Sequence, residues 1–194
     1  MRLVLASTSP RRAELLRAAG FEFDVMPAQV DEAMEVEETP DGYARRVAQL
    51  KAEGVAPRAP GRVILGADTI VVVDNDVLGK PTSVDDARGM LRRLSGREHE
   101  VVTAVCLLDL RRERGSKRIL AGITRTTVEW APLTPEEVEW YLGSGEPMGK
   151  AGGYAVQGLA SRFVTRIDGS YSNVVGLPVA VVYDLCKRAG ILVF

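Results

Sequence analysis

Histidine and cysteine are scarce in this sequence, which has one histidine, His99, and two cysteines, Cys106 and Cys186, among 194 residues. One histidine and two cysteines are too few to form a Cys/His metal cluster or a disulfide framework. Both cysteines lie among apolar residues, so we expect buried thiols in a reducing compartment. His99 precedes a β-like run and has no serine or cysteine beside it. We therefore expect a structural role for it.

Excess charge and long apolar runs are also missing. The formal net charge is −1, so no overall field favours nucleic acid or an anionic membrane, and an anion site has to come from local clustering. No apolar run approaches the length of a membrane span, and Met1 leads straight into a strand pattern without the apolar segment of a signal peptide. We expect a cytoplasmic protein with neither nucleic acid nor membrane as partner.

The patterns that are present predict an α/β fold. Hydrophobic residues make up 46% and charged residues 26% of the chain, as in ordinary globular proteins, and the length predicts one domain spanning residues 1–194. Strand and helix patterns alternate around a substantial sheet. Strands are expected at 3–5, 21–26, 62–78 with a tight turn at 74–76, 99–110, 119–131 and 163–167. The two long strands, 99–110 and 119–131, are expected to form an antiparallel hairpin across the charged segment 111–118. Helices are expected to begin at Pro10, Pro40, Val84, Pro135 and Pro178.

The N-terminal segment combines hydroxyl groups, two arginines and the start of a helix. Ser9 and Pro10 predict the N-cap and the first helical residue, because the missing N–H of proline costs nothing there. Backbone N–H groups would then lie beside Ser7, Arg11 and Arg12, a composition that favours an anion such as phosphate. Arg12 falls on the apolar stripe of the helix and needs a partner there. A structural ion pair for Arg12 and a solvated position for Arg11 are the alternatives.

Asp68 lies within the densest strand pattern of the chain, with apolar residues on both sides and Gly66 just before it. A buried carboxylate needs a compensating cation or hydrogen-bond donors, so we interpret Asp68 as a general base or a metal ligand. The alternative is an aspartate that bends or caps the strand by accepting backbone N–H groups. If the chain turns at Asn75, residues near 70 and 71 pair with Lys80. Lys80 then lies about 7 to 10 Å from Asp68, and its side chain can close much of that gap.

Three further polar residues are candidates. Lys51 ends the second predicted helix, and Glu32 lies in the acidic segment 30–38. Together they could complete a set of two carboxylates and several cations, with ordinary surface charges as the alternative. Gln157 lies in the glycine-rich segment 143–158 beside Tyr154. Its amide can read a base edge, and the alternative is an amide bonded to its own loop.

Taken together, these segments are similar to the Maf family of nucleoside triphosphate pyrophosphatases, also known as septum-formation proteins. The matching motifs follow one another along nearly the whole chain: Leu5-Ala6-Ser7-Thr8-Ser9-Pro10-Arg11-Arg12, Val30-Asp31-Glu32, Lys51-Ala52, Gly66-Ala67-Asp68-Thr69, Gly79-Lys80-Pro81, Leu94-Ser95-Gly96 with His99 and Thr103, Glu146-Pro147, Lys150-Ala151-Gly152, Tyr154-Ala155-Val156-Gln157-Gly158 and Val175-Gly176-Leu177-Pro178. The resemblance implies a fold like that of inosine triphosphate pyrophosphatase, with a central mixed sheet, flanking helices and a cleft between two lobes. The family is frequently homodimeric.

The resemblance also implies a reaction and a set of residue roles. It implies that dTTP and UTP are hydrolysed between the α- and β-phosphates in the presence of Mg²⁺ or Mn²⁺. Modified pyrimidine nucleotides are further expected substrates. This is a housecleaning role in the nucleotide pool. Asp68 corresponds to the general base, and Glu32 to a second carboxylate that holds the metal or orients water; both are the implied metal ligands. The implied phosphate ligands are Ser7, Arg12, Lys51 and Lys80, and the positions associated with base choice are Arg11, Thr69 and Gln157.

Thr69 and Gln157 together are similar to the branch that acts on dTTP and UTP. The branch that prefers 7-methyl-GTP typically has glutamine after the aspartate and glutamate in place of Gln157. Gly149 departs from the family, which commonly has aspartate there, and we expect this to change loop order or metal affinity more than the reaction. The alternatives are a 7-methyl-GTP pyrophosphatase and a regulator of cell division that binds a nucleotide without hydrolysing it.

Overall fold

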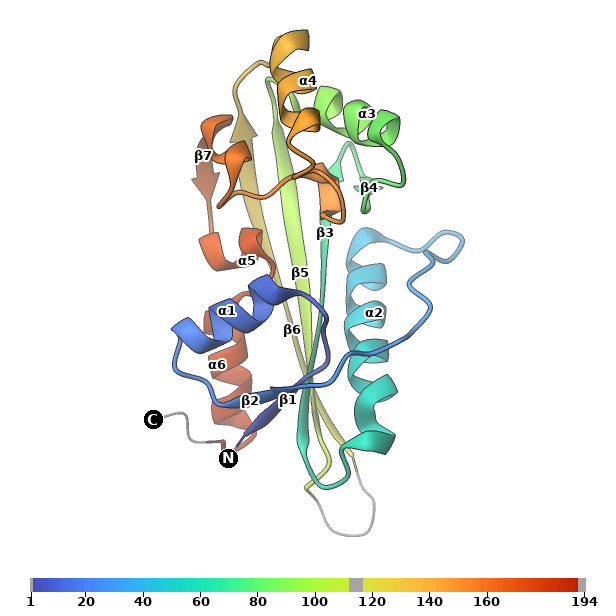
Figure 1. Ribbon diagram of the computed structural model, residues 1–194. Coiled ribbons are helices and arrows are strands. Elements are labelled where there is room, and N and C mark those ends of the chain that lie inside the picture. The colour runs from blue at the N-terminus through green and yellow to red at the C-terminus, as the bar shows by residue number, and fades with distance from the viewer. Residues whose placement is uncertain (1, 112–116, 192–194) are drawn as a thin grey trace. The chain divides into compact units, whose positions relative to one another are not determined.

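The computed structural model describes residues 2–111 and 117–191, which form a mixed succession of strands and helices (Figure 1). The strands are β1 (Leu3–Leu5), β2 (Phe23–Val25), β3 (Val63–Val73), β4 (Asp76–Leu78), β5 (Glu98–Asp109), β6 (Arg118–Trp130) and β7 (Val164–Asp168). The α-helices are α1 (Pro10–Ala18), α2 (Pro40–Val55), α3 (Val84–Leu94), α4 (Pro135–Gly143), α5 (Tyr171–Val175) and α6 (Val179–Arg188). Short 3₁₀ turns lie at η1 (Ala56–Arg58), η3 (Ala151–Gly153) and η4 (Leu159–Arg162).

Local signals place the starts of α1 to α4 where the sequence predicts them, whereas α6 begins at Val179, with the predicted first residue Pro178 as its N-cap. Thr39 and Ser83 cap α2 and α3 by accepting backbone N–H groups. Thr134 forms a full capping box with Glu137 at the start of α4. Ser9 is the N-cap of α1, but its side chain makes no cap hydrogen bond. The short helix α5 was not predicted, and the charged segment between β5 and β6 lies largely outside the described residues, at 112–116.

The strands form one mixed sheet in the order β2-β1-β3-β5-β6-β7, with β4 paired to β3. β1 runs parallel to both β2 and β3, whereas the pairs β3–β4 and β6–β7 are antiparallel. The α/β prediction of a mixed sheet with flanking helices is therefore confirmed. None of the helices in residues 2–111 and 117–191 combines the length and apolar character needed to cross a bilayer.

The chain divides into two compact units. Unit 1 comprises Met1–Asp68, Thr103–Thr124 and Gly176–Phe194, and unit 2 comprises Thr69–Val102 and Arg125–Val175. The strands β3, β5 and β6 contribute residues to both units. The boundary in β3 falls directly after Asp68.

In unit 1, α1 and α6 lie on one side of the strands and α2 lies on the other (Figure 1). Side chains of β3 alternate between the two faces. Val63, Leu65 and Ala67 belong to the core formed with α1 and α6. Gly66 faces α2, where a Cβ atom would lie 2.1 Å from the carbonyl oxygen of Ala48. The missing side chain lets α2 pack directly on the strand backbone, and Asp68, two residues further on, faces the same helix.

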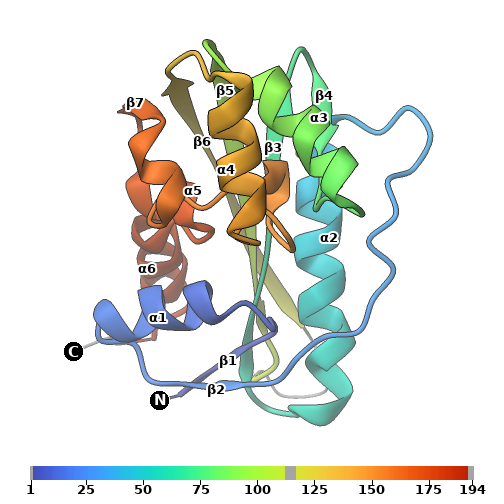
Figure 2. The same cartoon turned by 45° about the horizontal axis from the view of Figure 1, so that its top comes forward.

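In unit 2, the helices α3 and α4 lie beside each other (Figure 2). A buried aromatic cluster is formed by His99, Trp130, Tyr154 and Phe163. The imidazole Nε2 of His99 and the hydroxyl of Tyr154 share a hydrogen bond of 2.7 Å. Burial lowers the pKa of His99 to about 4, so its ring stays neutral at physiological pH, in keeping with the expected structural role.

Candidate active site

The parallel pairing of β1 with β3 brings two candidate segments together in unit 1. Leu5 lies opposite Leu65, and the N–H of Ala6 donates to the carbonyl of Leu65 at 2.9 Å. The segment between β1 and α1 therefore begins beside Leu65 of β3, three residues before Asp68 in the same strand. The carboxyl ends of parallel strands are where α/β folds commonly place their ligands.

Ser7 and Arg12 form one hydrogen-bonded unit at the start of α1. The hydroxyl oxygen of Ser7 accepts from the N–H of Ser9 at 3.1 Å and from Nη1 of Arg12 at 3.2 Å. With both acceptor positions of Ser7 occupied, its O–H proton remains to be donated to a further acceptor. The Nε of Arg12 donates to the carbonyl of Gly176 at 2.9 Å, which fixes the guanidinium plane.

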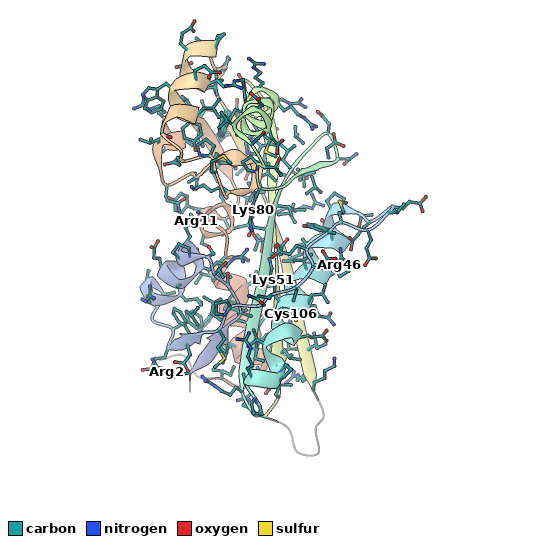
Figure 3. The ribbon with its side chains drawn as sticks, turned by 45° about the vertical axis from the view of Figure 1, so that its right-hand side comes forward. Arg2, Arg11, Arg46, Lys51, Lys80 and Cys106 are labelled. Atoms are coloured by element: carbon teal, nitrogen blue, oxygen red, sulfur yellow. The ribbon has the colours of Figure 1, made fainter. Side chains whose placement is uncertain are left out.

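Arg12 is buried, and its environment is strongly charged. Burial lowers the pKa of Arg12, while the negative charge of Asp68, and to a smaller degree that of Glu32, opposes this decrease. The first turn of α1 carries no acidic residue. A cationic group is thus held in the fold close to two carboxylates, at a helix N-terminus that favours anions. Arg11 is half-buried on the same helix (Figure 3).

Asp68, Lys51 and Glu32 form the charged centre of unit 1. The Nζ of Lys51 lies 2.8 Å from Oδ1 of Asp68 and 3.0 Å from Oε2 of Glu32. The side chains of Lys51 and Asp68 are only 10% and 8% exposed, whereas that of Glu32 is 40% exposed. Asp68 is therefore paired with a lysine, and its role as a general base or metal ligand remains a prediction. The structure brings together five of the predicted residues: Ser7, Arg12, Glu32, Lys51 and Asp68.

Two residues that the sequence analysis did not single out as site residues hold the segment carrying Glu32. The hydroxyl of Tyr43 donates to the backbone carbonyl of Glu32 at 2.8 Å. The Nη2 of Arg46 donates to the carbonyl of Ala33 at 2.8 Å. Tyr43, Arg46 and Lys51 all belong to α2, and Figure 3 marks the two cationic members of this set. Backbone carbonyls are present at every residue, so no sequence pattern indicated these contacts.

Three predicted residues, Thr69, Lys80 and Gln157, belong to unit 2. The hairpin expected around Asn75 is confirmed, with Val71 opposite Leu78 and Val73 opposite Asp76. This register places residue 71 opposite residue 78 rather than Lys80, because the turn consists of Asp74 and Asn75, both with positive φ. Lys80 is exposed and lies just beyond β4. Its predicted distance from Asp68 remains a prediction.

The turn that carries Gln157 is fixed by Glu146. The carboxylate of Glu146 accepts the N–H groups of Leu159 at 3.0 Å and Ala160 at 3.3 Å, and the hydroxyl of Tyr141 at 2.8 Å. A Cβ atom on Gly158 would lie 2.3 Å from this carboxylate, so glycine is required for the close approach. Gln157 itself is exposed on this turn.

Gly149 has a φ of +74°, and a Cβ atom there would meet nothing within 4 Å. The position therefore has room for a side chain, and its left-handed backbone is one that Asp and Asn adopt more readily than most residues.

Within residues 2–111 and 117–191, no group of three or more His, Cys, Asp or Glu is arranged to hold a metal ion.

Comparison with known proteins identifies the family of this chain. A model of the family described as "Maf-like protein" matches residues 2–189. A protein of Anaeromyxobacter sp. (strain Fw109-5), named dTTP/UTP pyrophosphatase, is 49% identical over 189 residues, covering 97% of this chain and 90% of its own. A protein of the same name from Koribacter versatilis (strain Ellin345) is 50% identical over 192 residues, covering 99% of this chain and 96% of its own.

The fold is also similar to that of a solved structure. The Ham1 protein of Staphylococcus aureus superimposes with a TM-score of 0.50 and 12% identity, covering 96% of this chain and all of that one. This likeness agrees with the fold that the sequence resemblance implies. The match of the family model over nearly the whole chain, together with relatives at about half identity, shows that the chain belongs to the family of Maf-like proteins.

Proposed function

We propose that this protein is a nucleoside triphosphate pyrophosphatase that hydrolyses dTTP and UTP to the monophosphate and pyrophosphate. The observation that carries the proposal is the buried Asp68, ion-paired with Lys51 and close to the Ser7–Arg12 unit at the start of α1. The substrate class is supported by the relatives named dTTP/UTP pyrophosphatase, which match this chain at 49% and 50% identity.

Cations and hydroxyl donors of unit 1 bind the triphosphate in this proposal. Arg12 and the hydroxyl of Ser7, which are hydrogen-bonded to each other beside the N-terminus of α1, are proposed to bind a phosphate. The ammonium of Lys51 has three N–H donors; it donates one hydrogen bond to Asp68 and forms an ion pair with Glu32. We propose that the same ammonium also donates to a phosphate oxygen. Lys80 is proposed as a further phosphate ligand from unit 2.

Asp68 acts as the general base. It takes a proton from the attacking water, the water oxygen bonds to phosphorus, and the bond between the α- and β-phosphates breaks with release of pyrophosphate. Phosphoryl transfer depends mainly on positioning and on neutralising charge. The ion pair with Lys51 holds the Asp68 carboxylate in one orientation before substrate arrives.

We also propose Asp68 and Glu32 as the protein ligands of a divalent cation. Their carboxylates already converge on one positive charge, the Lys51 ammonium, at 2.8 and 3.0 Å. Mg²⁺ is commonly bound through one or two carboxylates together with substrate phosphates, and carboxylate oxygens are ligands that it prefers. A bound Mg²⁺ or Mn²⁺ would neutralise charge on the triphosphate and polarise its phosphorus–oxygen bonds.

Base choice is assigned to Arg11, Thr69 and Gln157. Gln157 supports this role because its turn is fixed by Glu146 while its own amide is exposed. An amide offers both a donor and an acceptor to a pyrimidine edge.

Turnover of dTTP, UTP and 7-methyl-GTP by the same preparation tests the proposal, with pyrophosphate and inorganic phosphate measured separately. We expect pyrophosphate from both pyrimidine nucleotides and a kcat/KM at least about tenfold lower for 7-methyl-GTP. Preference for the methylated purine would assign the protein to the other branch. Nucleotide binding without metal-dependent turnover would instead support the alternative of a cell-division regulator that binds a nucleotide without hydrolysing it.

The proposal extends to the state and location of the protein. A cytoplasmic location is supported by Cys106 and Cys186, which are free, buried thiols. We further propose that residues 1–194 form a single domain and that the protein is a homodimer. Its proposed partner is a nucleotide rather than a nucleic acid. Gel filtration with light scattering measures the oligomeric state.

A further inference from the structure

The segment that carries Glu32 has no regular secondary structure. Residues 26–39 connect β2 to α2 without a helix or strand. The hydrogen bonds within this segment include one from the N–H of Ala33 to Oδ1 of Asp31 at 2.9 Å and one from the N–H of Glu35 to Oε2 of Glu38 at 3.1 Å. The Glu32 carboxylate is nevertheless held 3.0 Å from the Lys51 ammonium. Neither of these two bonds involves the Glu32 side chain, and contacts from outside the segment add to the restraint on its backbone.

Two side chains of α2 provide that restraint. Tyr43 donates its hydroxyl to the carbonyl of Glu32, and Arg46 donates Nη2 to the carbonyl of Ala33, each at 2.8 Å. Arg46 also binds both carboxylate oxygens of Glu38, with Nε to Oε1 at 2.8 Å and Nη2 to Oε2 at 2.7 Å. The two side chains thus hold the backbone carbonyls of Glu32 and Ala33 and the carboxylate of Glu38, near the end of the segment.

Holding these carbonyls restricts the direction of the Glu32 side chain. The Glu32 carbonyl belongs to the peptide unit that follows its Cα atom, so fixing that planar unit removes much of the local backbone freedom. Tyr43 and Arg46 lie one turn apart on α2, the helix that also carries Lys51. The restraint on Glu32 and its ionic partner are therefore parts of one rigid element.

Tyr43 is suited to a permanent donor role. Burial, together with the nearby charges of Asp68 and Glu32, raises the pKa of Tyr43 to about 12. Its O–H proton therefore stays in place throughout the physiological pH range. The guanidinium of Arg46 lies over the Tyr43 ring, 5.7 Å from its centroid, so the two side chains support each other.

We propose that Tyr43 and Arg46 are positioning residues that act through Glu32, by holding its backbone so that its carboxylate meets Lys51, the ionic partner of Asp68. This inference rests on the proposed function, which gives Glu32 a role in hydrolysis. Neither residue needs to contact the substrate.

A double-mutant cycle between Tyr43 and Glu32 tests the proposal. Tyr43→Phe removes only the hydroxyl, and we expect it to lower kcat for dTTP by about tenfold, the effect of one hydrogen bond, with a much smaller change in KM. In a Glu32→Gln background the same substitution is expected to leave kcat unchanged, because the residue it positions no longer acts. Arg46→Gln serves as a second variant with the same expected pattern.

Arg58→Gln is the matched control. Arg58 donates to the carbonyl of Pro27 at 2.6 Å, a bond of the same kind in the same segment but five residues before Glu32. We expect its kcat to equal that of the wild type. Amide hydrogen exchange at residues 32–34 gives a readout independent of catalysis, and it should rise in Tyr43→Phe but not in Arg58→Gln.

The outcomes separate this inference from the proposed function. An equal loss of kcat from Tyr43→Phe in both backgrounds, or no loss in either, overturns the positioning role while leaving the function intact. If Glu32→Gln alone leaves kcat unchanged, the role of Glu32 in the proposed function fails and the inference fails with it. If the wild type releases no pyrophosphate, unchanged exchange at residues 32–34 in Tyr43→Phe still refutes the restraint.

Discussion

Gly66→Ala tests whether the contact between β3 and α2 builds the charged centre. The added Cβ would lie 2.1 Å from the carbonyl oxygen of Ala48 and 2.8 Å from the backbone nitrogen of Ala52. Real Cβ atoms stay beyond about 3.0 Å from such neighbours, and backbone atoms cannot rotate away as a side chain can. The helix must therefore retreat by about 1 Å, and overpacking of this kind costs about 1–3 kcal/mol.

The same displacement should reduce activity, because Lys51 precedes Ala52 on the retreating helix and its 2.8 Å contact with Asp68 would lengthen. Misplacement of a catalytic group by about 1 Å can cost up to about a hundredfold in rate. We therefore expect a stability loss of about 3 kcal/mol, near the upper end of the overpacking range, and a drop in kcat/KM of about tenfold to a hundredfold.

Urea unfolding and pyrophosphate release measure the two effects, and Gly89→Ala is the control. Gly89 lies within α3, where a Cβ atom would meet nothing within 4 Å. The same substitution there should stabilise the protein by about 0.5–1 kcal/mol and leave turnover unchanged. The reasoning is refuted if Gly66→Ala matches the wild type in stability, or if both alanine variants behave alike.

Two further predictions concern buried charge. Lys51→Met leaves the buried Asp68 carboxylate without its cation and is expected to lower the free energy of unfolding by about 3–5 kcal/mol; adding Asp68→Asn should recover part of that loss, and additive losses in the double variant would contradict the pairing. For His99, burial lowers the folded-state pKa to about 4, whereas the unfolded value is about 6.5. Between these values only the unfolded chain binds the proton, so the contribution is complete above about pH 6.5 and is lost as the pH falls, by about 2 kcal/mol at pH 5. Urea unfolding of the wild type and of His99→Gln, at about pH 7 and about pH 5, measures this loss of stability. An NMR titration in which the single imidazole titrates near pH 6.5 in the folded protein would refute the prediction.

The helix starts and the strands of this fold could be predicted because their signals are local. Thr39, Ser83 and Thr134 cap the helices that follow them, and the paired turn residues at 74–75 join β3 to β4. The short helix α5 was missed because it is a few residues long and has no acidic first turn or basic last turn. Its formation depends on tertiary contacts such as the bond from the Asn173 amide to the Val101 carbonyl, at 2.9 Å.

The site could be predicted as a set of residues but not as an arrangement. Ser7 and Arg12 lie near each other along the chain, so their grouping follows from the helix start. The pairing of Lys51 with Asp68 depends on how closely α2 packs on β3, which Gly66 controls without any signal in α2 itself. Tyr43 was visible only as a helix residue because its partner is a backbone carbonyl. Asp68 stood out because a carboxylate inside an apolar strand requires a reason.

Asp68→Asn measures the central claim most directly. The substitution keeps the shape of the side chain but removes the base, which contributes about a hundredfold to ten-thousandfold in proton-transfer catalysis. We predict that pyrophosphate release from dTTP falls by about a thousandfold while the circular dichroism spectrum stays unchanged. Asp184→Asn, at a surface aspartate that is 63% exposed, should be fully active. Unimpaired turnover by Asp68→Asn, or release of inorganic phosphate alone by the wild type, would contradict the account.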